Sequence, residues 1–471
     1  MAELAALNAA ELSAGFAAKA FSPVEVSGAL LARIEKLDGA LNAFCLLDAP
    51  TALAQAKASE ARWHKGAPLS ALDGVPVAIK DLLLTAGWPT LRGSKTIDPG
   101  QAWNVDAPAV ARLREAGAVL LGKTTTPEYG WKGVTDSPLT GITRNPWDPG
   151  KTPGGSSGGS AAALAARLAP LAIGTDGGGS IRIPASFSGV FGLKPTYGRV
   201  AAFPPSPFGT LAHIGPMSRD VTGSAMLLDV ISGSDARDPF GLPPAQDSFT
   251  ARLDDGVRGK RIAFSPAMSF ASHVDSEVAV LVAAAAQKFE SLGAVVEAAD
   301  PPLLDGEDPK ADFRILWWAG AGFLLGDYPE EKKALLDPGL RAMVEEGMTI
   351  PLRRYQQAAM ARAAYASAMR QFMARFDYVL TPAVAVTAFD VGQLSPWAPN
   401  GNAWLDWTPF SVPFNLTQQP AASVPCGFTR AGLPVGLQIA GRLYDDGGVL
   451  AAAMAYQAAA PFFAAAPPGF Q

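Results

Sequence analysis

Short apolar segments alternate with longer amphipathic segments along most of this chain. The apolar segments are bounded by turn residues, are typical of buried strands, and lie at 75–80, 118–123, 171–176, 261–266, 378–383 and 435–441. Apolar residues recur at helical spacing near 23–37, 48–63, 106–116, 157–168, 217–231, 275–292, 352–375 and 446–459. This alternation predicts an α/β protein in which helices pack in layers against a sheet.

The 471 residues fit one large domain better than several. Segments rich in proline and glycine at 232–248 and 299–309 have the composition of linkers, but strand-like segments continue beyond both. The alanine-rich stretch at 161–166 fits a closely packed helix better than a disordered chain. We therefore expect a single domain over residues 1–471.

Charge and residue counts argue against several classes of function. Lys and Arg number 38 against 43 Asp and Glu, and no long run of like charges appears, so a nucleic-acid groove is not expected. The two cysteines, Cys45 and Cys426, are too few and too distant in sequence for a disulfide framework or a metal cluster. The three histidines, His64, His213 and His273, lack zinc-binding spacing and offer little for a Ser-His-Asp triad. Any nucleophile would need a different base.

The N-terminal segment does not look like a targeting signal. It has no basic region, and Glu3, Glu11 and Lys19 interrupt its apolar residues, which predicts an amphipathic helix. No uncharged apolar stretch reaches the roughly 18 residues of a membrane span. We expect a cytoplasmic protein with no membrane partner.

The densest signal is a region rich in glycine and serine at 150–200. Residues 154–160 (GGSSGGS) form a loop without bulky side chains, and an alanine-rich helix follows. Residues 177–180 (GGGS) follow a predicted strand and could direct several backbone N–H groups at one oxygen atom. Ser180 would then be a nucleophile beside its own oxyanion donors. The alternative is a pair of tight turns whose serines have no catalytic role.

Lys80 is the candidate base for such a serine. It ends an apolar segment, VPVAI at 75–79, that should be buried. Burial disfavours the ammonium form and can bring a lysine pKa from about 10.4 towards neutrality. The alternatives are that Lys80 extends to solvent at the strand end or pairs with Asp81.

Several long segments resemble the amidase signature hydrolases, which use a Ser–cisSer–Lys triad. The resemblance covers nearly the whole chain and is carried, in the order expected for the family, by GVPVAIKD, LLGKTTTPEYGWKGVTDSPLTGITRNPWDPGKTPGG, GGSSGGSAAALAA, GTDGGGSIRIPASFSGVFGLKPTYG and PFNLTQQPAASVPCGFTRAGLPVGLQIAGR. It implies that Lys80 is the base and that Ser156 is the bridging serine of a cis peptide bond. It also implies that Ser180, 24 residues after Ser156, is the nucleophile.

The resemblance further implies a fold and a reaction. The fold is a large mixed central β-sheet flanked by helices on both faces, with a catalytic core at about 70–200 and a variable substrate-pocket region at about 300–415. The reaction is hydrolysis of a carboxylic amide to an acid plus ammonia or an amine through an acyl-serine, with oxyanion donors at Gly177, Gly178 and Gly179. No cofactor or metal is expected, the partner is a small-molecule amide substrate, and a homodimer is left open.

Three positions depart from common residues of that family. Gly177 and Ser188 do so without touching the triad, and Gly177 could either loosen the oxyanion loop or leave room for a substrate. Ile183 stands where the glutaminase subunit of the tRNA-dependent amidotransferase usually has Gln, which disfavours that alternative function.

Residues 117–124 also match G-x-x-x-x-G-K-[ST], the pattern of a phosphate-binding loop. Their middle is strand-like, and Pro127 interrupts the helix that should follow. We interpret Lys123 and Thr124 as residues of a strand end.

Aromatic residues outside the glycine-rich region are candidates for an acyl pocket. They are Tyr129, Trp131, Trp317, Trp318, Trp397, Trp404 and Trp407. Packing in the core or in a lid is the alternative for any single tryptophan. Together they indicate a bulky or aromatic acyl group.

Overall fold

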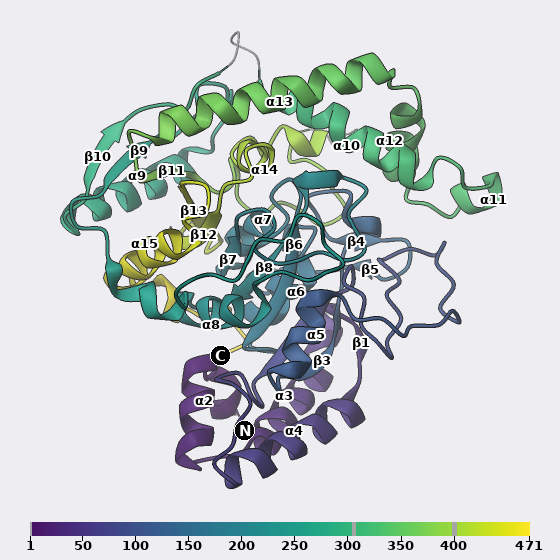
Figure 1. Ribbon diagram of the computed structural model, residues 1–471, viewed down its shortest axis with the longest axis vertical. Coiled ribbons are helices and arrows are strands. Elements are labelled where there is room, and N and C mark those ends of the chain that lie inside the picture. Colours follow the sequence, from purple (N-terminus) through teal and green to yellow (C-terminus); the bar gives the residue numbers. More distant parts are fainter. Residues whose placement is uncertain (1, 304–307, 398–402) are drawn as a thin grey trace.

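The computed structural model describes residues 2–303, 308–397 and 403–471, and one eleven-stranded sheet runs through it (Figure 1). In sheet order the strands are β1 (Phe44–Leu47), β3 (Val119–Thr124), β2 (Pro76–Lys80), β6 (Leu171–Asp176), β8 (His213–Ser218), β7 (Phe191–Lys194), β12 (Ala421–Phe428), β13 (Pro434–Gly441), β11 (Tyr378–Pro382), β9 (Arg261–Phe264) and β10 (Val295–Ala298). A small hairpin pairs β4 (Asp136–Ser137) with β5 (Gly141–Ile142).

The sheet is mixed. β3, β2 and β6 run parallel to one another, and so do β11, β9 and β10. Between these two sets, from β6 across to β11, each strand is antiparallel to its neighbour. Parallel strands need crossover connections, which helices supply here, whereas antiparallel strands do not. The predicted α/β fold with a large mixed sheet is confirmed.

Helices surround the sheet. They are α1 (Ala2–Ala6), α2 (Ala9–Ala18), α3 (Pro23–Leu37), α4 (Ala49–His64), α5 (Pro108–Glu115), α6 (Gly158–Ala165), α7 (Arg182–Ser188), α8 (Val221–Ile231), α9 (Ser276–Ser291), α10 (Lys310–Leu325), α11 (Glu330–Lys333), α12 (Pro338–Met348), α13 (Leu352–Met373), α14 (Val412–Leu416) and α15 (Asp446–Ala459). In Figure 1 the long helix α13 crosses one end of the molecule with α10 and α12, and α2, α3 and α4 lie at the other end. Within the described ranges, no helix has the length and apolar character needed to cross a membrane.

Side chains of the central strands are buried on both faces because they alternate along each strand. In β2, Val77 and Ile79 pack into the core that also contains residues of α8. Ala78 and Ala172, from β2 and β6, face the opposite core, which contains the alanine-rich helix α6. Small residues on both partners let α6 pack closely against the sheet. The last residues of β2 and β6 therefore reach one edge of the sheet side by side, next to the start of α6.

Every strand and helix named from periodicity is present, with ends shifted by a few residues. The pattern missed β1, β7, β8, β10 and β12 and the helices α7, α10 and α12. β8 (HIGPMS) contains Pro216, which normally argues against a strand in the middle of a sheet. α10 buries residues around most of its circumference, so it has no polar face to reveal a helical period.

A glycine at the contact of α10 and α12 gives a test of this packing. A Cβ at Gly347 would overlap the backbone carbonyl of Trp318, which cannot move aside as a flexible side chain could. Gly347→Ala should therefore lower the free energy of unfolding by about 1–3 kcal/mol. Gly28→Ala in α3 is the control, because no atom lies within 4 Å of that Cβ, and it should be neutral or slightly stabilising. Urea denaturation compares the two variants, and equal midpoints would contradict close packing at Gly347.

Candidate active site

Lys80 is the last residue of β2 and its side chain is completely buried. Its Nζ donates hydrogen bonds to Ser156 Oγ at 2.7 Å, to Ser157 Oγ at 2.8 Å and to Thr175 Oγ1 at 2.8 Å. Burial lowers the pKa of Lys80 well below its ordinary value. The residue is thus an amine in contact with three hydroxyl groups and shielded from water.

The two alternatives for Lys80 do not hold. Its side chain does not reach solvent, and the neighbouring Asp81 forms an ion pair with Lys123 at 3.5 Å instead. Lys123 lies within β3 and is itself completely buried, with its Nζ donating to the carbonyl oxygen of Leu83 at 2.6 Å. The segment that matches a phosphate-binding loop is therefore a buried strand, as its apolar middle predicts.

The loop at 154–160 brings Ser156 to Lys80. The peptide bond between Gly155 and Ser156 is cis. A Cβ at Gly155 would lie 2.6 Å from the carbonyl oxygen of Val134, so only glycine fits at this close approach. The N–H of Ser157 donates to the carbonyl oxygen of Ser180 at 3.1 Å. This bond ties the first serine-containing loop directly to the second.

Asp176, the last residue of β6, organises the second loop. Its carboxylate accepts the N–H of Gly179 at 2.8 Å and the N–H of Ile181 at 3.2 Å. Gly179 is thereby unavailable as an oxyanion donor, which corrects the expectation that all three glycines serve in that role. Among the described residues, the N–H groups of Gly177 and Gly178 have no acceptor, and they remain the candidates.

A buried ion pair holds Asp176 in place. Arg182 donates to its carboxylate from Nε and Nη2, each at 2.9 Å, and neither side chain is exposed. Burial opposes the charged carboxylate, but the guanidinium of Arg182 prevails and holds the pKa of Asp176 below its usual range. Arg182 also donates to Asn415 Oδ1 at 2.6 Å and to Gln438 Oε1 at 2.7 Å. The loop is thus fixed to α14 and β13.

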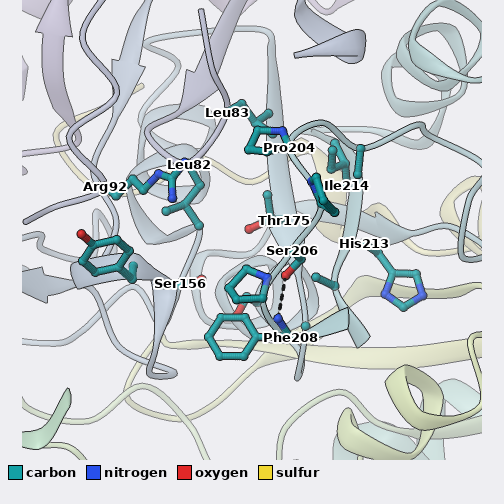
Figure 2. A pocket seen from close by; sticks show the side chains of 18 of the residues that line it. Leu82, Leu83, Arg92, Ser156, Thr175, Pro204, Ser206, Phe208, His213 and Ile214 are labelled. Carbon is teal, nitrogen blue, oxygen red and sulfur yellow. Dashed lines mark hydrogen bonds between the residues drawn. The ribbon is translucent and has the colours of Figure 1, made fainter. Parts of the chain in front are cut away.

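A cavity of about 140 Å3 opens beside these groups (Figure 2). Ser156, Thr175 and Ser180 all line it, and Ser180 is 8% exposed. Most of the remaining wall is apolar and includes Leu82, Leu83, Pro204, Phe208, Ile214 and Trp317. The serines of both loops therefore face one small, largely apolar space.

Only some of the predicted aromatic residues reach this cavity. Tyr129 and Trp317 line it. Trp404 lies behind Gly178, where a Cβ would be 3.4 Å from its ring, and is not part of the lining. Trp397 is 45% exposed on the surface.

Three other tryptophans are core residues instead of pocket residues. Trp131, Trp318 and Trp407 are fully buried and do not line the cavity. Trp318 follows Trp317 on α10, and successive helical residues point about 100° apart, so only one of the two faces the cavity. Trp407 stacks on Phe187 with ring centroids 5.7 Å apart.

Five residues that position the site escaped the sequence reasoning: Ser157, Thr175, Asp176, Arg182 and Asn415. Asp176 and Arg182 did leave a signal, since two opposite charges six residues apart occur in a segment of small and apolar residues. Such charges are rarely buried unless paired. Asn415 lies 239 residues from Asp176 in sequence, and nothing in its surroundings reveals the contact.

Comparisons with known proteins agree with this geometry. A family model described as amidase matches residues 25–450. An acylamidase of Rhodococcus erythropolis is 36% identical over 463 residues, covering 97% of this chain and 96% of that protein. The glutaminase component of tRNA-dependent amidation in Myxococcus xanthus (strain DK1622), named as part of a glutamyl-tRNA(Gln) amidotransferase, is 37% identical over 486 residues, covering 98% and 99%.

A solved structure extends the similarity to the fold. The crystal structure of a bacterial aryl acylamidase of the amidase signature family is 31% identical, has a TM-score of 0.90 and covers 97% of each chain. Because the family model and both relatives extend over nearly all of the sequence, the chain belongs to the amidase signature family of hydrolases.

Proposed function

We propose that this protein is a stand-alone amidase that hydrolyses a linear carboxylic amide to an acid and ammonia or an amine, through an acyl intermediate on Ser180. The observation that carries the proposal is the 2.7 Å hydrogen bond between buried Lys80 and Ser156, beside a cavity that Ser180 also lines. A shielded amine next to a hydroxyl group is a base suited to serine chemistry.

Proton transfer begins at Lys80. A neutral amine has one lone pair and two N–H groups, and hydroxyl groups can both donate and accept, so the three hydroxyls around Nζ suit either protonation state. Ser156 passes the proton of Ser180 to Lys80 while Ser180 Oγ attacks the carbonyl carbon. The C–N bond then breaks and the proton returns to the leaving nitrogen. Water repeats the sequence and releases the acid.

The developing oxyanion is stabilised by the loop after β6. The N–H groups of Gly177 and Gly178 are the donors, and the bonds of Asp176 to the same loop hold them in place before the reaction starts. Donors fixed in advance stabilise a developing charge without a cost of reorganisation.

The cavity favours an amide with an apolar or aromatic acyl group. The rings of Phe208 and Trp317 stack with centroids 3.7 Å apart and form one wall. A Cβ at residue 177 would lie 2.5 Å from the Trp317 ring, so the space left by Gly177 is filled by Trp317 and not by a substrate.

A second candidate is the glutaminase subunit of a tRNA-dependent amidotransferase, favoured by the overall identity to the Myxococcus xanthus protein. The largely apolar cavity argues for the stand-alone amidase, and Ile183 is buried against Gly154 and Gly179 without a polar group to offer. An ammonia-release screen of the purified chain over aliphatic, aromatic and peptide amides and glutamine separates the two. Release from simple amides supports the proposal, and release from glutamine alone supports the glutaminase role.

Ser180→Ala tests the nucleophile. The variant should fold, because it removes one hydroxyl from a loop of small residues, and should retain less than about a hundredth of the wild-type kcat/KM. A fluorophosphonate probe should label wild-type protein at Ser180, as peptide mapping would report, and should leave the variant unlabelled. Labelling at Ser156 would reverse the roles of the two serines.

The pH profile tests the base. Because the neutral form of Lys80 is the active one, kcat/KM should rise with pH through an apparent pKa below the solution value of about 10.4 and fall as the pH drops below that apparent pKa. Lys80→Arg should be nearly inactive, since a guanidinium keeps its proton. The exposed Lys36→Arg is the control and should behave as wild type. A flat profile from pH 6 to pH 10, or an active Lys80→Arg variant, would remove Lys80 from the mechanism.

The contact of Gly177 with Trp317 gives a test of the cavity wall. Gly177→Ala should lower the free energy of unfolding by about 1–3 kcal/mol because its Cβ meets the indole ring. Trp317→Ala should cost about 3–5 kcal/mol. The double variant should lose clearly less than the two together, because the smaller residue at 317 makes room for the new methyl group. Urea denaturation of the four proteins measures the coupling, and simple additivity would contradict the contact.

A further inference from the structure

We propose that Arg92 binds a carboxylate of the substrate, so that the preferred amides carry an anionic group away from the scissile bond. This inference rests on the proposed amidase function and narrows its substrate class. It assigns a specificity role to a residue outside the Lys80, Ser156 and Ser180 set.

Arg92 is the charged side chain of the cavity wall. Among the described residues that line the cavity, it alone carries a full charge, since the burial of His213 keeps the pKa of that imidazole well below its ordinary value. Figure 2 shows Arg92 beside Leu82, across the pocket from Pro204 and Ile214. A substrate in this cavity therefore meets one cation in an otherwise apolar wall.

The backbone of Arg92 is held firmly. Arg92 and Gly93 both have left-handed φ angles, of 54° and 64°. The carbonyl oxygen of Arg92 accepts the N–H of Tyr129 at 2.8 Å. The carboxylate of Asp81 accepts the backbone N–H groups of Arg92 and Gly93. A left-handed residue with a large side chain is uncommon, and here these contacts fix where that side chain starts.

The guanidinium of Arg92, in contrast, has no partner among the described residues. No carboxylate oxygen of the described chain lies within 4.0 Å of it, and it makes no hydrogen bond there. Arg62 and Arg182 each contact an aspartate, at 2.6 and 2.9 Å. Arg92 is also partly buried, so its charge has lost some hydration without gaining a partner.

A carboxylate is the ligand that these features favour. A guanidinium stays charged over the whole accessible pH range and presents N–H groups in a planar fork that matches the two oxygens of a carboxylate. The apolar walls would hold the methylene groups or ring between this carboxylate and the amide. The carboxylate can belong to the acyl part, as in a monoamide of a dicarboxylic acid, or to the amine part, as in an N-acyl amino acid.

Steady-state kinetics with matched amides tests the assignment. Succinamic, adipamic and suberamic acids and an N-acyl glycine are the anionic substrates, and their methyl esters are the neutral references. Arg92→Gln should lower kcat/KM for the best anionic substrate by about tenfold or more, mostly through KM, because a hydrogen bond to a charged group is lost. Its effect on the neutral reference should stay within about twofold.

Two further variants sharpen the comparison. Arg92→Lys should recover part of the preference, since it restores the charge but not the fork. Lys95→Gln removes one positive charge from the same segment at an exposed position that does not line the cavity, and it should change neither substrate class. Equal losses for anionic and neutral substrates in Arg92→Gln, or no loss for either, would overturn the proposal.

A binding measurement separates this proposal from the proposed function. Isothermal titration of adipamic acid and of its methyl ester into the Ser180→Ala protein, with and without Arg92→Gln, requires no turnover. Tighter binding of the acid that is lost with Arg92→Gln supports the anion site even if the wild type hydrolyses no amide. Equal binding of acid and ester by the Ser180→Ala protein would reject the anion site even if the wild type is an active amidase.

Discussion

The buried carboxylate of Asp176 joins parts of the chain that lie far apart in the sequence. It accepts backbone N–H groups of the loop that leads into α7, the guanidinium of Arg182 and the amide of Asn415. Removing one partner of such a buried pair leaves an uncompensated charge and costs about 3–5 kcal/mol. The loop with Ser180, the start of α7 and the C-terminal strands therefore depend on a single carboxylate for their relative positions.

The same ion pair affects the base. The charge of Asp176 favours the ammonium form of Lys80, while burial of Lys80 favours the neutral amine and is the larger effect. Arg182 lies against Asp176 and offsets its charge. An unpaired Asp176 would draw a proton onto Lys80, so Arg182 helps to keep the lysine neutral without touching it. Structural support and the protonation state of the base thus come from one cluster of side chains.

The sequence predicted much of the fold but less of the site's surroundings. Periodicity located β2 and β6, and the glycine and serine loops pointed to Ser156 and Ser180, because short-range patterns report on local structure. The contact of Asn415 with Asp176 joins residues 239 apart in sequence and has no local pattern. Gly179 was expected to be an oxyanion donor because composition shows that a loop is open to N–H contacts, not which N–H group already has an acceptor.

The catalytic groups and the cavity wall are supported differently. Lys80 and Thr175 stand at strand ends, and Ser156 lies in a loop pressed against backbone atoms, so their positions follow from the sheet. The wall comes from side chains such as Phe208 and Trp317, on a loop and on α10. Changes in the wall should therefore alter substrate preference without moving Lys80. Trp317 is an exception because it contacts Gly177, so a change of substrate wall there also reaches the oxyanion loop.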